Sequence, residues 1–261
     1  MPTLRSLRPA APPPGNEDPL MSDPITQQQV AIVERAIDPR VVLFHSPSTR
    51  EAEQFRGLRN SILAMNPDRG HRTVVMAGST SGEGTTVSAV NLAFALAELA
   101  GTRVLLIDAN LRKPGVDAVL ALSKDYPGLS DMLEDRVPLS RAIRPTISKS
   151  LDALTAGRSI DSPAEVLARG RLKPLLDALK PNYSYIIVDT PPVNEYTDAS
   201  LIARDCDGVI LTIRIDGAPR AVVEQSVSQL RSLGANLLGS FVVGTPPAGK
   251  ASPVDTYARK L

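Results

Sequence analysis

Five short apolar runs recur between residues 74 and 243, and each is continuous rather than alternating with polar residues. They are Val74–Met76, Val104–Ile107, Tyr185–Val188, Val209–Ile213 and Leu237–Val243. Strands that are covered on both faces have this pattern, because neither face meets water. We therefore predict five buried strands.

Segments with helical spacing lie between these runs, at 87–99, about 163–179 and 219–233. In the last of them Val223, Val227 and Leu230 share one helix face. Alternation of strands and helices is typical of an α/β protein with a doubly wound, mostly parallel sheet and helices on both faces. We predict this fold.

A further helix is predicted before the first strand, over about 48–65. Phe55, Leu58 and Ile62 recur there at positions that share one face. Ser48, followed three residues later by Glu51, is a reasonable start for this helix.

The flanks of the chain have a different composition. Residues 1–24 hold seven of the 23 prolines, and the segment from Thr245 onward is again rich in proline and glycine. We expect 1–40 to be disordered or a linker, with a short helix over Gln27–Ala36 compatible with the pattern. The folded domain is predicted over 41–244, and 245–261 as a flexible tail.

Charge and composition exclude several classes of protein. The net charge is +1, so binding to nucleic acid is not expected from charge. The single cysteine, Cys206, fits a reducing compartment. No apolar run approaches the roughly 18 to 20 residues that a membrane span needs, and the N-terminus lacks a signal-peptide core. We expect a cytoplasmic protein whose membrane contact, if any, is peripheral or made through a partner.

The first candidate ligand-binding segment follows the first predicted strand, where a glycine-rich turn leads into a helix. This is the layout of a phosphate-binding P-loop, whose backbone N–H groups curl around an anion at a helix N-terminus. The lysine position of that loop holds Thr85, whereas Thr86 keeps the hydroxyl that ligates Mg²⁺. A glycine-rich turn that binds no ligand is the alternative. The candidate nucleotide-binding residues are Ser81, Gly82, Glu83, Gly84, Thr85 and Thr86.

Two further strands end in carboxylates, at Asp108 and Asp189. Ligands of open α/β sheets bind at the carboxyl ends of the strands, so both aspartates should reach the edge that carries the loop. Together with Thr86 they are candidate ligands of Mg²⁺ beside the phosphates of a nucleotide.

These segments resemble the bacterial tyrosine kinases of capsule and exopolysaccharide synthesis. The similarity covers about residues 48 to 243. The loop and the strand-end aspartates are shared with septum-positioning and partition ATPases, and the Leu-Arg-Lys-Pro and Gly-Leu-Ser segments narrow the resemblance to the kinases. It is carried by Gly82–Gly84, Val104–Pro114, Gly128–Leu133, Ile187–Pro192 and Asp198–Ile202.

The resemblance implies ATP or ADP and Mg²⁺ as ligands, with Asp108 assisting removal of a tyrosine proton and Asp189 holding the metal. It also implies that Glu53, Arg56 and Arg59 join subunits into a homo-oligomeric ring. The phosphoryl group would go to tyrosines in a neighbour's tail, where this chain has only Tyr257. The implied partner is a membrane polysaccharide co-polymerase or chain-length regulator.

This sequence departs from the family pattern at positions that bind the nucleotide or take part in catalysis in the family. No lysine occurs in the first 112 residues, so Lys113 and Arg112 are the candidates to supply the missing charge. Asn110 stands where the family often has a second aspartate. Near Val243 the family usually has an asparagine that contacts the base, and this chain does not.

Three hypotheses follow. The first is a regulatory pseudokinase that binds ATP with weak or absent kinase activity. The second is an active, divergent protein-tyrosine kinase that uses Asp108 with Lys113 or Arg112. The third is a partition-type ATPase, against which the near-zero net charge argues.

Overall fold

The structure, a computed structural model, describes residues 36–68 and 70–244. The predicted helix at Gln27–Ala36, apart from its last residue, the predicted tail at 245–261 and Tyr257 lie outside these residues. Of the predicted linker 1–40, only 36–40 are described, and they pack on the domain. Ile37 is buried, and the N–H of Asp38 donates to the carbonyl of Val119.

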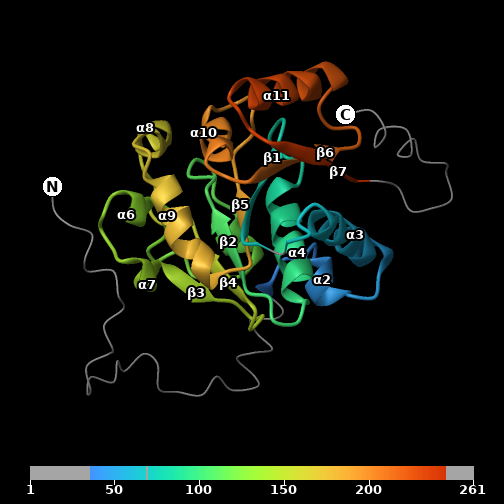
Figure 1. Cartoon of the computed structure of the whole chain (residues 1–261), viewed down its shortest axis with the longest axis horizontal. Coiled ribbons are helices and arrows are strands. Elements are labelled where there is room, and N and C mark those ends of the chain that lie inside the picture. Colours follow the sequence, from blue (N-terminus) through green and yellow to red (C-terminus); the bar gives the residue numbers. More distant parts are fainter. Residues whose placement is uncertain (1–35, 69, 245–261) are drawn as a thin grey trace. The chain divides into compact units, whose positions relative to one another are not determined.

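A seven-stranded sheet forms the centre of the described domain (Figure 1). Its spatial order is β3-β4-β2-β5-β1-β6-β7, and every neighbouring pair is parallel except β3 with β4. The strands are β1 (Arg72–Gly78), β2 (Val104–Asp108), β3 (Ile143–Pro145), β4 (Leu151–Leu154), β5 (Tyr185–Asp189), β6 (Gly208–Arg214) and β7 (Leu237–Val243).

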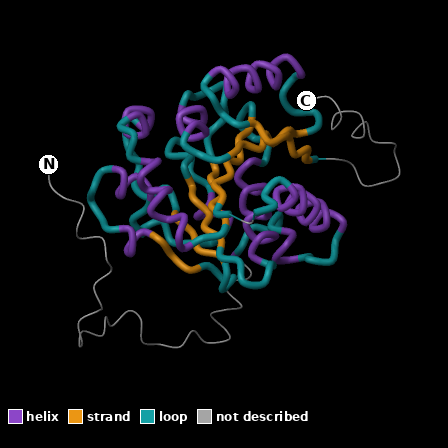
Figure 2. The backbone as a smooth tube through the Cα atoms, viewed as in Figure 1, coloured by secondary structure: helices purple, strands orange, loops and turns teal. Residues whose placement is uncertain are grey.

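Helices cover both faces of the sheet, as Figure 2 shows by the purple segments on either side of the orange strands. In chain order they are α2 (Val42–His45), α3 (Arg50–Ala64), α4 (Thr85–Ala97), α5 (Val116–Val119), α6 (Leu129–Leu133), α7 (Leu139–Ala142), α8 (Pro163–Ala168), α9 (Leu172–Leu179), the 3₁₀ turn η1 (Lys180–Asn182), α10 (Asp198–Arg204) and α11 (Arg220–Ser232). None of the helices in the described ranges is long and apolar enough to span a bilayer.

Successive residues of each strand enter two separate apolar cores, because side chains alternate across a strand. In β2, Leu105 and Ile107 pack in the core beneath α6 and α8 to α11, whereas Val104 and Leu106 pack in the core beneath α2 to α5. The predicted doubly wound sheet is therefore confirmed, and continuous apolar runs are its physical consequence.

Two predicted boundaries differ from the structure. The helix predicted over 163–179 is two helices, α8 and α9, because Gly170 between them has a φ of +70°, which an α-helix cannot accommodate. The N-cap of helix α3 lies one residue later than predicted. The side chain of Thr49, rather than Ser48, accepts from the N–H of Ala52 at 3.4 Å.

Candidate phosphate-binding site

The turn between β1 and α4 has the backbone of an anion cradle. Gly82 and Gly84 have φ angles of +86° and +79°, which residues with a side chain rarely adopt. Within the described residues, the N–H groups from Gly82 to Thr86 donate to no acceptor. Since α4 starts at Thr85, its positive dipole end adds to these open donors.

Helix α4 holds this turn rigidly at the edge of the sheet. Every residue from Ser88 to Leu96 is buried, so the helix is apolar on all sides and lies between α3 and the sheet. Ser88 and Asn91 are the polar residues of this stretch, and Asn91 joins α4 to the segment before it. Its side chain accepts from the N–H of Leu43 at 3.2 Å and donates to the carbonyl of Arg40 at 2.9 Å, which fastens α2 to α4.

The two strand-end aspartates lie side by side beneath the turn. Strands β2 and β5 are neighbours in the sheet, and Asp108 is paired with Asp189 in their register. The hydroxyl of Thr86 donates to Oδ2 of Asp189 at 2.7 Å. Oδ1 of Asp189 is buried without a hydrogen-bond partner among the described residues. The structure therefore brings Thr86, Asp108 and Asp189 together, as the sequence predicted.

Burial disfavours the charged form of both carboxylates. It raises the pKa of Asp108 to about 6, although three backbone N–H groups that donate to Asp108 act in the opposite direction. The pKa of Asp189 lies well above its usual range because of burial and of the neighbouring charge of Asp108. A divalent cation would relieve both effects, because it neutralises the pair and ligates the orphaned oxygen.

The segment after β2 folds around Asp108. Oδ2 of Asp108 accepts from the N–H groups of Gly115 at 2.9 Å and Val116 at 3.0 Å, and Oδ1 accepts from Asn110 at 3.1 Å. The side chain of Asn110 in turn accepts from the N–H of Lys113. Asn110 therefore shapes this loop through its side-chain oxygen.

The two candidate replacements for the loop lysine, Arg112 and Lys113, differ in whether their charged groups already have partners. Arg112 binds the buried carboxylate of Asp198 through two hydrogen bonds of 2.8 and 3.0 Å, and its guanidinium lies 4.2 Å from the centre of the Tyr196 ring. Lys113 is exposed, and within 36–68 and 70–244 its ammonium forms no ion pair or hydrogen bond. Of the two, Lys113 is the cation that is available to a ligand.

We expect Arg112→Ala to lower the free energy of unfolding by about 2–4 kcal/mol, because it leaves the Asp198 carboxylate buried without its partner. Lys113→Ala is expected to change it by less than about 0.5 kcal/mol, as for most exposed positions. Urea denaturation of the two variants beside the wild type measures both values. Equal effects of the two substitutions would contradict the assignment of Arg112 to structure.

Sequence reasoning missed two residues that contact the turn. The carboxylate of Glu195 accepts from the N–H and the hydroxyl of Ser81 at 2.7 and 2.9 Å, and Nη1 of Arg214 donates to the carbonyl of Gly82 at 3.1 Å. Arg214 ends β6, which is adjacent to β1 only in the folded sheet, and no spacing in the sequence indicates that contact.

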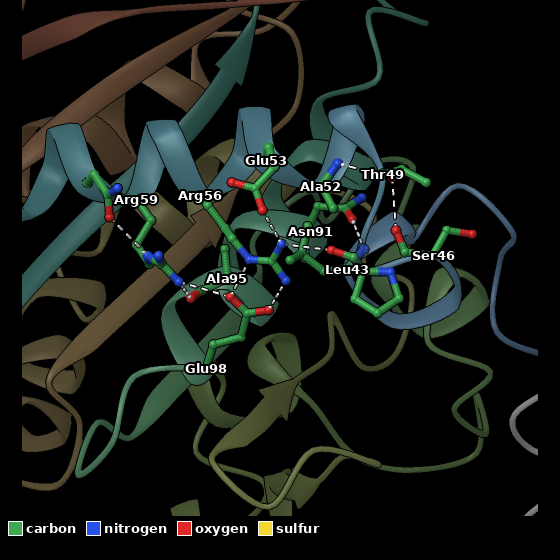
Figure 3. A network of polar contacts seen from close by, with 12 residues as sticks. Leu43, Ser46, Thr49, Ala52, Glu53, Arg56, Arg59, Asn91, Ala95 and Glu98 are labelled. Atoms are coloured by element: carbon green, nitrogen blue, oxygen red, sulfur yellow. Dashed lines mark hydrogen bonds and ion pairs between the residues drawn. The ribbon is translucent and has the colours of Figure 1, made fainter.

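The predicted oligomerisation motif on α3 is paired within its own chain (Figure 3). The guanidinium of Arg56 binds Glu53 at 2.5 Å and Glu98 at 2.5 Å, and Arg59 binds Glu98 at 2.9 Å. Glu98 directly follows α4, so these ion pairs join the far end of the P-loop helix to α3. Only Glu53 has a mostly exposed side chain. The two arginines therefore do not form the solvated helix face that such residues usually form, because both are paired with Glu98.

Comparison with known proteins gives a consistent set of matches. A family model described as an AAA domain matches residues 71–233. The tyrosine-protein kinase YwqD of Bacillus subtilis is 31% identical over 204 residues, which are 78% of this chain and 85% of that protein. The putative tyrosine-protein kinase CapB of Staphylococcus aureus is 29% identical over 81% of this chain and 91% of that protein. The kinase domain of the Escherichia coli tyrosine kinase ETK superposes with a TM-score of 0.77 at 26% identity, covering 83% of this chain and 84% of that domain.

Proposed function

Since the chain belongs to the P-loop family of bacterial tyrosine kinases, we propose that it binds ATP with Mg²⁺ and has weak or no kinase activity of its own. In this role it is a regulatory member of a capsule or exopolysaccharide assembly system. It acts through nucleotide occupancy and docking rather than through rapid phosphoryl transfer.

Nucleotide binding is supported by backbone N–H donors without acceptors that lie in the same site as a carboxylate oxygen without a donor. The N–H groups from Gly82 to Thr86 have no partner in the described part of the chain, and the buried Oδ1 of Asp189, whose carboxylate accepts from the hydroxyl of Thr86, has none either. The donors suit the phosphates, and the carboxylates with Thr86 suit Mg²⁺. When bound, Mg·ATP would supply the phosphoryl group, and the metal would neutralise its charge.

Weak turnover follows from Thr85. A threonine hydroxyl cannot place a positive charge against the β- and γ-phosphates, as the usual lysine does. Loss of one preorganised stabilising group typically costs about 3–4 kcal/mol in the transition state, or about 10²–10³ in rate. Backbone donors are unaffected by the substitution, so binding is retained better than catalysis.

An active tyrosine kinase is the second candidate, and the unpartnered ammonium of Lys113 favours it. Lys113 lies on the loop that Asp108 organises, so a charge from this side can approach the same edge of the sheet. In that case Asp108, with its pKa raised by burial to about 6, is suited to accept a proton from a tyrosine. The acceptor would be Tyr257 in the tail.

Assembly is proposed to use α3, in a ring that docks on a membrane polysaccharide co-polymerase or chain-length regulator. This would place the chain at the inner face of the cell membrane through its partner. Glu53 is the exposed member of the motif and is available to a neighbour. Arg56 and Arg59 reach a neighbour only by sharing or exchanging Glu98.

The test is titration calorimetry with ATP, in the presence and absence of Mg²⁺, followed by incubation with γ-labelled ATP and a peptide of the tail containing Tyr257. We expect binding that Mg²⁺ strengthens, and no label above background. Absence of heat at millimolar ATP in both conditions would contradict the proposed function. Label on Tyr257 would replace it by the active-kinase alternative.

A further inference from the structure

A third carboxylate, that of Glu83, is buried inside the turn itself. Its side chain belongs to a residue that is only 2% exposed. Oε2 accepts from the N–H groups of Ser79 at 2.5 Å and Thr80 at 3.3 Å, whereas Oε1 is buried and has no partner among the described residues. The hydroxyl of Ser79, fully buried, is also without a partner there. Buried polar atoms are rarely left in this state in native proteins.

Further oxygen atoms gather at the same place. A methyl group built on Gly78 would lie 2.5 Å from the hydroxyl oxygen of Thr85, 3.0 Å from Oε2 of Glu83 and 3.6 Å from the carbonyl oxygen of Thr80. The hydroxyl of Thr85 forms no hydrogen bond with the described residues. Two hydroxyls, a carbonyl and a carboxylate are hard oxygen ligands.

The charge of this region is unbalanced. Glu83, Asp108 and Asp189 are buried close to the cradle, and none of them forms an ion pair with a basic residue in 36–68 or 70–244. ATP would bring further negative charge to the same place. Mg²⁺ can bind Asp108 and Asp189, but neither aspartate shares a hydrogen-bond partner with Glu83, whose hydrogen bonds among the described residues are those from the N–H groups of Ser79 and Thr80.

We propose that a monovalent cation, K⁺ or Na⁺, binds between Glu83, Ser79 and Thr85 and supplies, for nucleotide binding, a positive charge where the loop lysine is missing. This inference rests on the proposed nucleotide binding. With the cation present, Glu83 is neutralised and the cradle no longer opposes the approach of a polyphosphate.

The ligand set selects the class of cation. A divalent ion that is held by protein groups without substrate phosphates usually takes more than one carboxylate, and the described residues contain no cluster of three acidic, histidine or cysteine side chains suited to a metal. One carboxylate with hydroxyl and carbonyl oxygens matches a single positive charge. The neighbouring Arg214 does not neutralise Glu83, because its guanidinium donates to the carbonyl of Gly82 and forms no ion pair with Glu83 among the described residues.

The experiment measures binding of a fluorescent ATP analogue with Mg²⁺ at constant ionic strength in K⁺, Na⁺, NH₄⁺ or tetramethylammonium chloride. Tetramethylammonium is too large and too apolar for an oxygen shell of this size. We expect the wild type to bind on the order of tenfold more tightly, or better, in at least one of the small cations. Thr85→Lys, which carries its own ammonium, is expected to bind equally in all four salts.

Two variants make the outcome specific. Glu83→Gln keeps an oxygen for the N–H of Ser79 but removes the charge, so its affinity should depend little on the cation. Lys173→Ala, which removes an exposed lysine of α9, should keep the dependence of the wild type. Thermal unfolding of each variant verifies that it is folded.

Equal wild-type affinity in all four salts would overturn the inference and leave the proposed function standing. The same cation dependence in Thr85→Lys as in the wild type would also overturn it, because the cation then acts elsewhere. Absence of nucleotide binding in every salt would remove both proposals. Anomalous scattering from Tl⁺, a K⁺ substitute, within reach of Glu83 in a crystal would support the site directly.

Discussion

Thr85→Lys is expected to convert a nucleotide-binding protein with little or no turnover into one that transfers phosphate measurably. We expect a gain of about 10²–10³ in the rate of phosphoryl transfer, with tighter binding of Mg·ATP. The measurement is single-turnover transfer from γ-labelled ATP to the tail peptide, with and without Mg²⁺.

The surroundings of residue 85 support this gain. Gly82 and Gly84 already have the left-handed backbone of the loop, and Thr86 already donates to Asp189. Residue 85 is only partly buried, so a longer side chain has access to solvent and to a ligand. The backbone of the turn and the contact between Thr86 and Asp189 are therefore already in place around residue 85.

Thr85→Met is the matched control, since it has a long side chain without charge. It is expected to give no gain in transfer. A gain with methionine equal to that with lysine would mean that length or packing matters rather than charge. No gain with lysine, although the variant binds ATP, would mean that the defect lies elsewhere in the site.

Asp189→Asn is expected to stabilise the metal-free protein by about 1–3 kcal/mol at pH 8, because it removes a buried charge and each unit of raised pKa corresponds to about 1.4 kcal/mol of penalty for the charged form. Asparagine keeps an oxygen for the hydroxyl of Thr86 and removes a negative charge beside Asp108. The same substitution should abolish the strengthening of ATP binding by Mg²⁺. Stability and ligand binding therefore change in opposite directions, as is common where a site stores unfavourable charge.

The stability difference should depend on pH. Burial raises the pKa values of Asp108 and Asp189, so between about pH 4 and the raised pKa the native state binds more protons than the unfolded state. The free energy of unfolding of the wild type then falls as pH rises through that window. The advantage of Asp189→Asn should be small near pH 4 and should grow as pH rises and the pair loses its protons, a range that includes about pH 6, the raised pKa of Asp108.

Urea denaturation in EDTA at several pH values tests this dependence, with Asp207→Asn as a control of opposite sign. Burial pushes the pKa of Asp207 upward, but hydrogen bonds from Thr73 and the charge of Lys180 outweigh it and leave that pKa below its usual range. Asp207→Asn should therefore destabilise the protein at pH 8. Destabilisation by Asp189→Asn at pH 8 would contradict the assignment of a strained acidic pair.

Much of the fold was readable from the sequence because its signals are local. Continuous apolar runs predicted β1, β2, β5, β6 and β7, since a strand covered on both faces has no polar side. The short edge strands β3 and β4 were not predicted. β3 has three residues and β4 four, too few for a periodic signal, and their pairing is antiparallel and depends on the rest of the sheet.

The sequence by itself determined which groups are present at the strand ends: the glycines of the turn, Thr86, Asp108, Asp189 and the substitution at residue 85. Only the tertiary structure decided how they are used. The order of the strands sets Asp108 against Asp189, ties Arg112 to Asp198 and brings Arg214 to the loop. Burial raises the pKa values of the aspartates, because desolvation depends on how the whole chain packs and not on a single residue. The same packing leaves Oε1 of Glu83 without a partner among the described residues.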